Sequence, residues 1–207
     1  IFQSQLEHLS QSGPSCFNDL DMLTVGMYNQ GNVAIGKACT DNEYRMQFSL
    51  WCLSGAPLIM GADIRSISPQ MEKLLLNKDL ISINQDPECR PPYLVGKRSV
   101  MVPEENTDDA VEPLRMVKDK LLTFIKHLSN QEFAIAYYNL HEDKQEMHCI
   151  FADVGLPYTS GYGFDMTDVF TGEHIGLKRD YHVISVPGHD CRLFRCRLVN
   201  CAANDKK

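Results

Sequence analysis

Two different sequence patterns divide the chain near residue 90, and this division constrains the fold more than any other feature. From Phe17 to Asp86, short apolar runs alternate with helical patterns, as in parallel β-strands that are each followed by a helix. From residue 91 onward, short strand-like segments are separated by turn-forming residues, which predicts an antiparallel β-sandwich. We therefore predict an α/β part over 1–90, an all-β part over 91–200 and a tail over 201–207.

The α/β part contains only two candidate strands, Met22–Gly26 and Ala56–Gly61. Both are continuous apolar runs, as expected for strands of a parallel sheet that is covered on both faces. A (β/α)8 barrel needs eight strands and about 250 residues. The two units would therefore be at most the last two of such a barrel.

Two helices are expected beside these strands. Thr40 and Glu43 have the spacing of a capping box and predict a helix that ends near Gly55. Its aromatic residues recur on one face and are expected to be core residues; they are Tyr44, Phe48 and Trp51. Ser68-Pro69 predicts the start of a second helix, which runs through Leu76.

In the second part, the region from Pro103 to Pro113 is acidic and is expected to be a solvated loop. Six strands are expected after it. They are Leu121–Leu128, Phe133–Leu140, Met147–Phe151, Phe164–Phe170, His182–Val186 and Arg192–Val199.

Composition excludes several classes of protein. The chain has 43% hydrophobic and 23% charged residues, which is ordinary for a globular protein, and its net charge is −7. A negative chain gains nothing from binding nucleic acid or an anionic membrane, so neither is an expected partner. Its apolar runs fall short of the roughly 20 residues that span a bilayer, and a membrane protein is not expected.

The eight cysteines show no Cys-x-x-Cys spacing, so no metal site is expected, and most should be small buried hydrophobes. Cys191, Cys196 and Cys201 recur every five residues, and in a strand an odd spacing sends neighbours to opposite faces. Cysteines of this kind favour a reducing compartment.

Asp19 and Asp21 are the most conspicuous pair of carboxylates. On a strand they would point to one face about 6.6 Å apart, from a rise of about 3.3 Å per residue. Glycosidases need two carboxylates that flank the scissile bond from opposite sides, so this pair is not expected to be their acid and nucleophile. We expect one of the two to bind substrate or orient a neighbour and the other to cap the loop, while Asp63 ends the next run as a site residue or a cap.

Five segments resemble glycoside hydrolase family 27, the α-galactosidase (melibiase) family. They are Cys16–Leu23, Asp41–Trp51, Ala56–Met60, Asp63–Arg65 and Ile83–Asp86, in this order. Phe17 stands where many members carry Trp, and Leu20 where many carry Pro, departures that suggest a bacterial-type member. The resemblance covers the first half closely, and an antiparallel C-terminal β-domain is what the family implies for the second.

The resemblance implies the C-terminal portion of a retaining exo-glycosidase that hydrolyses terminal α-D-galactosides through two Asp residues on earlier barrel strands. The motifs that carry this pair are absent from matching places, since Lys118-Asp119-Lys120 and Arg65 lie in other contexts. No catalytic residue is therefore expected in this chain, which alone should be inactive. Asp21 and Met22 match family residues that line the galactose pocket, and no cofactor or metal is implied.

The expected partners are a galactoside substrate and the missing N-terminal barrel portion, and a homo-oligomer is compatible with the sequence. For location the interpretation favours the cytoplasm of a bacterium, with secretion left open. One alternative is a carbohydrate-binding or interaction module without hydrolytic activity. Another keeps the family but changes the sugar to an α-N-acetylgalactosaminide or a β-L-arabinopyranoside.

Overall fold

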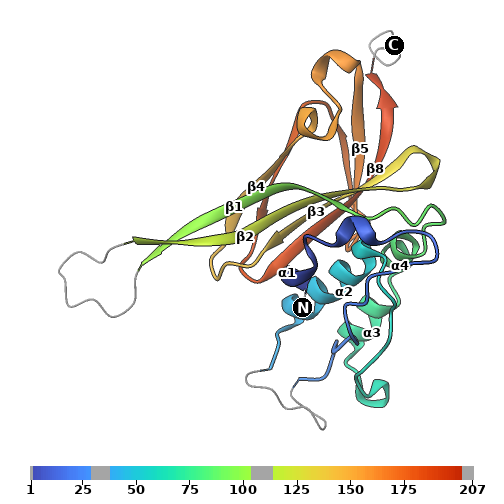
Figure 1. Cartoon of the computed structure of the whole chain (residues 1–207), viewed down its shortest axis with the longest axis vertical. Coiled ribbons are helices and arrows are strands. Elements are labelled where there is room, and N and C mark those ends of the chain that lie inside the picture. The colour runs from blue at the N-terminus through green and yellow to red at the C-terminus, as the bar shows by residue number, and fades with distance from the viewer. Residues whose placement is uncertain (1, 29–37, 104–113, 202–207) are drawn as a thin grey trace.

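The computed structural model describes residues 2–28, 38–103 and 114–201, and Figure 1 shows helices packed below a large twisted sheet. The predicted acidic loop, apart from its first residue, and the tail beyond Cys201 lie outside these residues. The helices precede the strands in the chain. They are α1 (Phe2–Gln5), α2 (Asp41–Ser54), α3 (Pro69–Leu75) and α4 (Lys78–Asn84), with short 3-10 turns at Leu9–Gln11, Ile64–Ser66, Ser129–Gln131, Phe151–Val154 and Tyr158–Ser160.

Helix α2 begins and ends where the sequence predicts. The Thr40 side chain accepts a hydrogen bond from the Glu43 backbone N–H, and the Glu43 carboxylate accepts one from the Thr40 N–H, so the capping box is confirmed. Gly55 ends the helix in the left-handed conformation at φ 69°, which costs glycine little. The predicted aromatic stripe is buried, since Trp51 is 6% exposed and Tyr44 and Phe48 are each 2% exposed.

The second predicted helix is confirmed as α3, with Ser68 as its N-cap and Pro69 in its first turn. Helix α4 was not predicted from the sequence. Asn77 starts it by accepting hydrogen bonds from the N–H groups of Asp79 and Leu80 at 3.0 Å each.

The two strands predicted in the first part are much shorter than expected. They are reduced to one parallel bridge between Leu23 and Met60, in which the Leu23 N–H donates to Ile59 O and the Gly61 N–H donates to Leu23 O, both at 2.8 Å. Helix α2 connects the two segments, so the connectivity is that of a β-α-β unit. One bridge does not make the two full strands that were predicted, because a parallel strand needs pairing neighbours to continue it.

The second part consists of two antiparallel sheets, as predicted. The larger has the order β1-β2-β3-β8-β5-β6, and the smaller pairs β4 with β7. Strands β1 and β6 were not predicted. The strands are β1 (Tyr93–Pro103), β2 (Leu114–His127), β3 (Glu132–Asn139), β4 (Gln145–Ile150), β5 (Tyr162–Asp168), β6 (His174–Lys178), β7 (Tyr181–Val186) and β8 (Asp190–Asn200).

Both faces of the larger sheet are buried, and each has its own hydrophobic cluster. On β3, Ile135 and Tyr137 pack in the cluster shared with β4 and β7, whereas Ala136 and Tyr138 pack in the cluster shared with the helices. The alternation of side chains along β3 therefore separates two cores. The predicted division near residue 90 falls between the end of α4 and the start of β1, but the two parts share the helix-side cluster, and separate domains stay a prediction.

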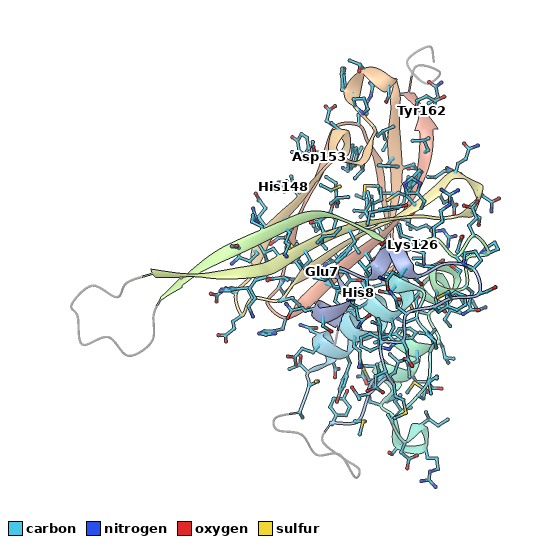
Figure 2. The ribbon with its side chains drawn as sticks, viewed as in Figure 1. Glu7, His8, Lys126, His148, Asp153 and Tyr162 are labelled. Carbon is cyan, nitrogen blue, oxygen red and sulfur yellow. The ribbon has the colours of Figure 1, made fainter. Side chains whose placement is uncertain are left out.

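Polar contacts also join the helices to the sheet. Arg45 on α2 meets Asp190 on β8 through its Nε at 3.0 Å and its second guanidinium nitrogen at 2.6 Å. Lys126 on β2 lies where the sheet meets the helices (Figure 2) and donates from Nζ to the carbonyl of Leu53 in the last turn of α2, at 3.0 Å. These two contacts hold α2 against the sheet, one at Arg45 and the other at the last turn of the helix.

The cysteines are free thiols, and five of them are buried. Cys191 belongs to the helix-side cluster and Cys196 to the opposite one, so their predicted placement on opposite faces of one strand is confirmed. No helix among the described residues has the length and apolar character needed to cross a membrane.

Candidate substrate-binding edge

The segment from Asp19 to Thr24 presents Asp21 and Met22 to solvent while its neighbours are buried. Leu20 is fully buried and Leu23 is 1% exposed, whereas Met22 is 52% exposed. The two leucines anchor the segment in the helix-side cluster. The two predicted substrate-binding residues are therefore accessible at the surface.

Hydrogen bonds hold this segment in one conformation. The Asp21 N–H donates to Asp19 Oδ1 at 2.8 Å, and the Asp21 carbonyl accepts from Trp51 Nε1–H, also at 2.8 Å. The Met22 N–H donates to Asp21 Oδ1 at 2.7 Å. Further along, the Thr24 N–H donates to Gln47 Oε1 at 3.1 Å. Together with the parallel bridge at Leu23, these contacts satisfy each backbone N–H from Asp21 to Thr24.

Asp19 and Asp21 do not lie on a strand, so the strand spacing considered for this pair does not apply. Asp21 has a φ of 71°, in the left-handed region, and the hydrogen bond from its N–H to the Asp19 carboxylate closes an Asx-turn. The reason is that an Asp carboxylate can accept a hydrogen bond from the N–H two residues on, and Asp tolerates the left-handed conformation better than most residues. The two carboxylates thus have different tasks, since that of Asp19 caps the turn that exposes Asp21.

Asp63 is a cap, which was one of its two predicted roles. Its carboxylate accepts from the Arg65 backbone N–H at 3.0 Å and pairs with the Arg65 guanidinium at 2.7 Å. The hydrogen bonds from the Arg65 side chain and backbone lower the pKa of Asp63 to about 2. Asp21 comes two residues before the Leu23–Met60 bridge and Asp63 three residues after it, so they do not occupy matching ends of the two segments.

Large apolar side chains are exposed on and near the two bridged segments. Phe17 is 48%, Ile59 53% and Ile64 62% exposed. A Cβ atom on Gly61 would lie 3.1 Å from the Cβ of Met22, so glycine permits the close approach of the two segments there.

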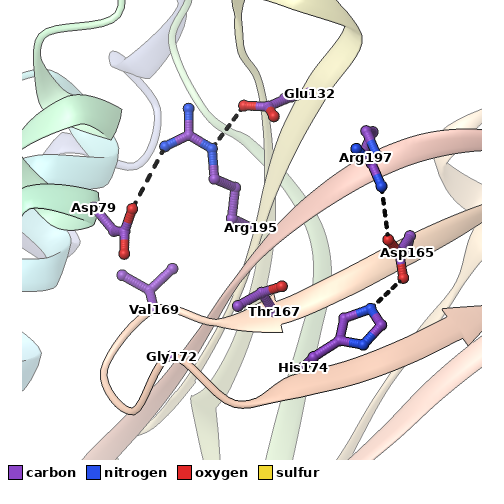
Figure 3. A pocket seen from close by; sticks show the side chains of 9 residues that line it. All are labelled: Asp79, Glu132, Asp165, Thr167, Val169, Gly172, His174, Arg195 and Arg197. Atoms are coloured by element: carbon purple, nitrogen blue, oxygen red, sulfur yellow. Dashed lines mark hydrogen bonds and ion pairs between the residues drawn. The ribbon is translucent and has the colours of Figure 1, made fainter.

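A cavity of about 520 Å³ lies elsewhere, between α4 and strands β3, β5, β6 and β8 (Figure 3). Arg195 crosses it, pairing with Glu132 at 2.6 Å and reaching Asp79 on α4 at 4.0 Å. Asp165 pairs with Arg197 at 3.1 Å and with His174 at 2.6 Å.

Each charged side chain of this cavity therefore already has a partner of opposite sign. The ion pairs of Arg195 join α4 to the sheet, and we interpret them as contacts that stabilise the fold. This cavity was not predicted from the sequence, because its residues come from distant segments of the chain.

The described histidines are dispersed, and two of them, His141 and His182, are buried. His182 is 5% exposed, and its Nδ1 lies 3.1 Å from the Tyr137 hydroxyl. Burial, aided by the charge of Lys178, lowers the pKa of His182 to about 4. Within the described ranges, no three His, Cys, Asp or Glu side chains are grouped so that they could hold a metal ion.

Sequence reasoning missed the contacts that shape the Asp21 turn. Trp51 was assigned to the core by its helical spacing, and it is buried, but its indole N–H also reaches the Asp21 carbonyl. A buried indole N–H needs an acceptor, and this general requirement is the one signal that could have suggested a second role.

Two family models match the chain and together cover most of it. Residues 1–86 match the model described as alpha galactosidase A, and residues 118–196 match the alpha galactosidase C-terminal beta sandwich domain. The chain is 31% identical over 165 residues to the alpha-N-acetylgalactosaminidase of Mus musculus, which covers 78% of this chain and 32% of that protein. It is 31% identical over 195 residues to an alpha-galactosidase of Schizosaccharomyces pombe, which covers 93% of this chain and 39% of that protein.

The chain thus spans about one third of the length of these curated relatives. A similar fold occurs in the crystal structure of a putative alpha-galactosidase/melibiase from Bacteroides fragilis, with a TM-score of 0.74 and 25% identity over 95% of this chain and 38% of the other. Whether the chain is of a bacterial type stays a prediction. The matches to both parts, in the order the sequence motifs predict, show that the chain belongs to glycoside hydrolase family 27, the α-galactosidase (melibiase) family.

Proposed function

We propose that this chain is the C-terminal portion of a retaining exo-glycosidase that hydrolyses terminal α-D-galactosides, and that residues outside the chain complete its barrel. Asp21 and Met22 then line the galactose pocket, and the acid and nucleophile lie outside the chain. A retaining glycosidase holds these two carboxyl groups about 5–5.5 Å apart on either side of the scissile bond and proceeds through a covalent glycosyl-enzyme. The galactoside and the rest of the barrel are the proposed partners.

The observation that carries this proposal is the fixed, exposed turn at Asp21. Its carboxylate uses Oδ1 to accept the Met22 N–H, and Oδ2 accepts no hydrogen bond from the described residues. An exposed carboxylate oxygen on a rigid backbone suits a sugar hydroxyl, since the acceptor is already in place before the ligand arrives.

The assignment of the catalytic pair to other residues has separate support. Asp19 is engaged in the turn and Asp63 is paired with Arg65, so neither is poised opposite Asp21. The exposed Phe17, Ile59 and Ile64 supply an apolar surface onto which further βα units can pack.

The test compares two preparations on a nitrophenyl α-galactoside. The purified 207-residue chain is expected to give no turnover, and the protein expressed from its complete gene is expected to give turnover with retention of configuration. Asp21→Asn in the latter should raise KM, because it removes one charged acceptor from the pocket. Turnover by the 207-residue chain that Asp21→Ala abolishes would contradict the proposal.

A second substrate is favoured by one observation, the 31% identity to a mouse alpha-N-acetylgalactosaminidase. The same preparations should therefore be assayed on the nitrophenyl α-N-acetylgalactosaminide, and the ratio of the two kcat/KM values assigns the sugar. A stand-alone carbohydrate-binding module is the remaining alternative. It predicts sugar binding without hydrolysis from every preparation, and the core shared by helices and sheet weighs against it.

A further inference from the structure

We infer that Asp19 and Trp51 are positioning residues for the sugar-binding carboxylate of Asp21, an inference that rests on the proposed function. Neither side chain is expected to touch the sugar. Their role is to hold the Asp21 peptide from both sides, so that its side chain leaves the surface in one direction.

The backbone of Asp21 is in a conformation that needs support from its surroundings. Its φ of 71° is a conformation that residues other than glycine adopt rarely, and it persists only when surrounding contacts favour it. Two contacts do so here. Asp19 Oδ1 accepts the N–H of Asp21, and Trp51 Nε1 donates to the carbonyl oxygen of Asp21, each at 2.8 Å.

The indole of Trp51, which is the donor, is held rigidly. Trp51 lies in the last turns of α2 and is 6% exposed, packed in the helix-side cluster. Its own carbonyl accepts from the Gly55 N–H and the Ala56 N–H, at the C-terminal end of the helix. The indole therefore cannot follow the turn if the turn moves, and it fixes the carbonyl of Asp21 relative to the helix.

Helix α2 makes a second contact to the same segment, from Gln47 to Thr24. Gln47 precedes Trp51 by one helical turn, so the two side chains lie on one face of α2. Gln47 Oε1 accepts both the N–H and the hydroxyl of Thr24, at 3.1 Å each. Helix α2 thus holds the segment on both sides of the Leu23 bridge, while the Asp21 side chain stays exposed.

The experiment uses four variants of the protein expressed from its complete gene. Trp51→Phe removes the indole donor, and Phe48→Leu is the matched control, since Phe48 is a buried residue of α2 whose side chain has no hydrogen-bonding group. Asp19→Ala removes the carboxylate acceptor, whereas Asp19→Asn keeps an oxygen in its place. The readouts are kcat and KM on the nitrophenyl α-galactoside, and the HN–Hα coupling of Asp21 by NMR in the 207-residue chain.

A misplaced binding group weakens ground state and transition state together, so KM should rise about tenfold for Trp51→Phe and Asp19→Ala while kcat changes little. Asp19→Asn should restore KM, and Phe48→Leu should leave it unchanged. The Asp21 coupling should move away from its left-handed value only in Trp51→Phe and Asp19→Ala. The surface substitution Asp19→Ala keeps the test decisive if Trp51→Phe does not fold.

Kinetics of Trp51→Phe and Asp19→Ala that match the control, or an Asp21 coupling that stays unchanged, would overturn the inference. A loss of activity in Asp19→Asn equal to that in Asp19→Ala would also overturn it, because it would make the charge of Asp19 the essential property. Failure of the unsubstituted protein to hydrolyse the substrate would instead overturn the proposed function, and this is known before any variant is assayed.

Discussion

Replacing Lys126 by Met should change the pH dependence of stability in a defined window. Lys126 is 1% exposed on β2, and its ammonium donates to the Leu53 carbonyl at the end of α2. Burial is the main cause that lowers the pKa of Lys126 from 10.5 to about 8, and the nearby charge of Asp86 opposes it only in part. The charged form of Lys126 is therefore less stable in the folded chain than in the unfolded chain, where water solvates it.

The sign and the size follow from this difference. Between pH 8 and 10.5 the unfolded chain binds more protons at this lysine than the folded chain, so the free energy of unfolding rises with pH. A difference of about 2.5 pKa units corresponds to about 3 kcal/mol, nearly all of it still a cost at pH 7. Met has a similar length and no charge, and its variant should lack this rise, although it forfeits about 1–3 kcal/mol by leaving the Leu53 carbonyl unpaired.

The measurement is urea unfolding from pH 7 to 10.5, followed by the fluorescence of Trp51, the single tryptophan of the chain. Tyrosines and cysteines titrate in both proteins, so the quantity to compare is wild type minus Lys126→Met, which should rise by about 3 kcal/mol across the window. Lys73→Met, at an exposed position of α3, serves as the control and should give a flat difference. A difference for Lys126→Met that is also flat to within about 0.5 kcal/mol would refute the reasoning.

Three further changes test other contacts. Arg45→Met should lower the free energy of unfolding, measured in urea, by about 2–3 kcal/mol, because the buried Asp190, whose side chain is 1% exposed, loses its main partner. A loss below about 0.5 kcal/mol would show that Arg192 alone is enough to pair with Asp190. The pKa of His182 is lowered to about 4, so between pH 6.5 and 4 the unfolded chain binds a proton there that the folded chain does not, and the free energy of unfolding should fall as the pH falls. His182→Phe should remove this part of the acid dependence. Equal dependence of stability on pH in both proteins would contradict the prediction. Gly188→Ala should cost roughly 3 kcal/mol or more in thermal unfolding, because a Cβ there would overlap the Glu142 carbonyl, whereas Gly13→Ala has open space around it; equal melting temperatures for the two would be inconsistent with this turn.

Local chemistry explains which elements could be predicted from the sequence. The start of α2 depends on Thr40 and Glu43, and the start of α3 on Ser68 and Pro69, so each signal lies within four residues of the element it begins. Helix α4 begins at Lys78, just beyond the predicted end of the preceding helix at Leu76, and the capping signal of Asn77 was not recognised. Strands β1 and β6 lie at the two edges of the large sheet, where one side of the strand has no partner strand and the apolar pattern is weakest.

The site could be predicted only in part, for a different reason. The exposure of Asp21 and the separate capping role of Asp19 follow from short-range preferences of Asp, and the sequence analysis included both roles without deciding between them. The left-handed backbone of Asp21 depends on Trp51, thirty residues further along the chain, and a spacing rule for strands gives the wrong geometry there. Contacts between distant segments decide such details, and no local pattern records them.

Helix α2 links the larger β-sheet to the Asp21 turn, because one part of the helix surface contacts the sheet and another contacts the turn. Arg45 and the Leu53 carbonyl are held by Asp190 on β8 and by Lys126 on β2. Gln47 and Trp51 hold the turn. A substitution on the sheet that lets α2 shift therefore displaces the anchors of Asp21 without touching the turn itself. The larger sheet therefore does more than cover apolar surface, since its contacts hold the helix that supports the exposed carboxylate.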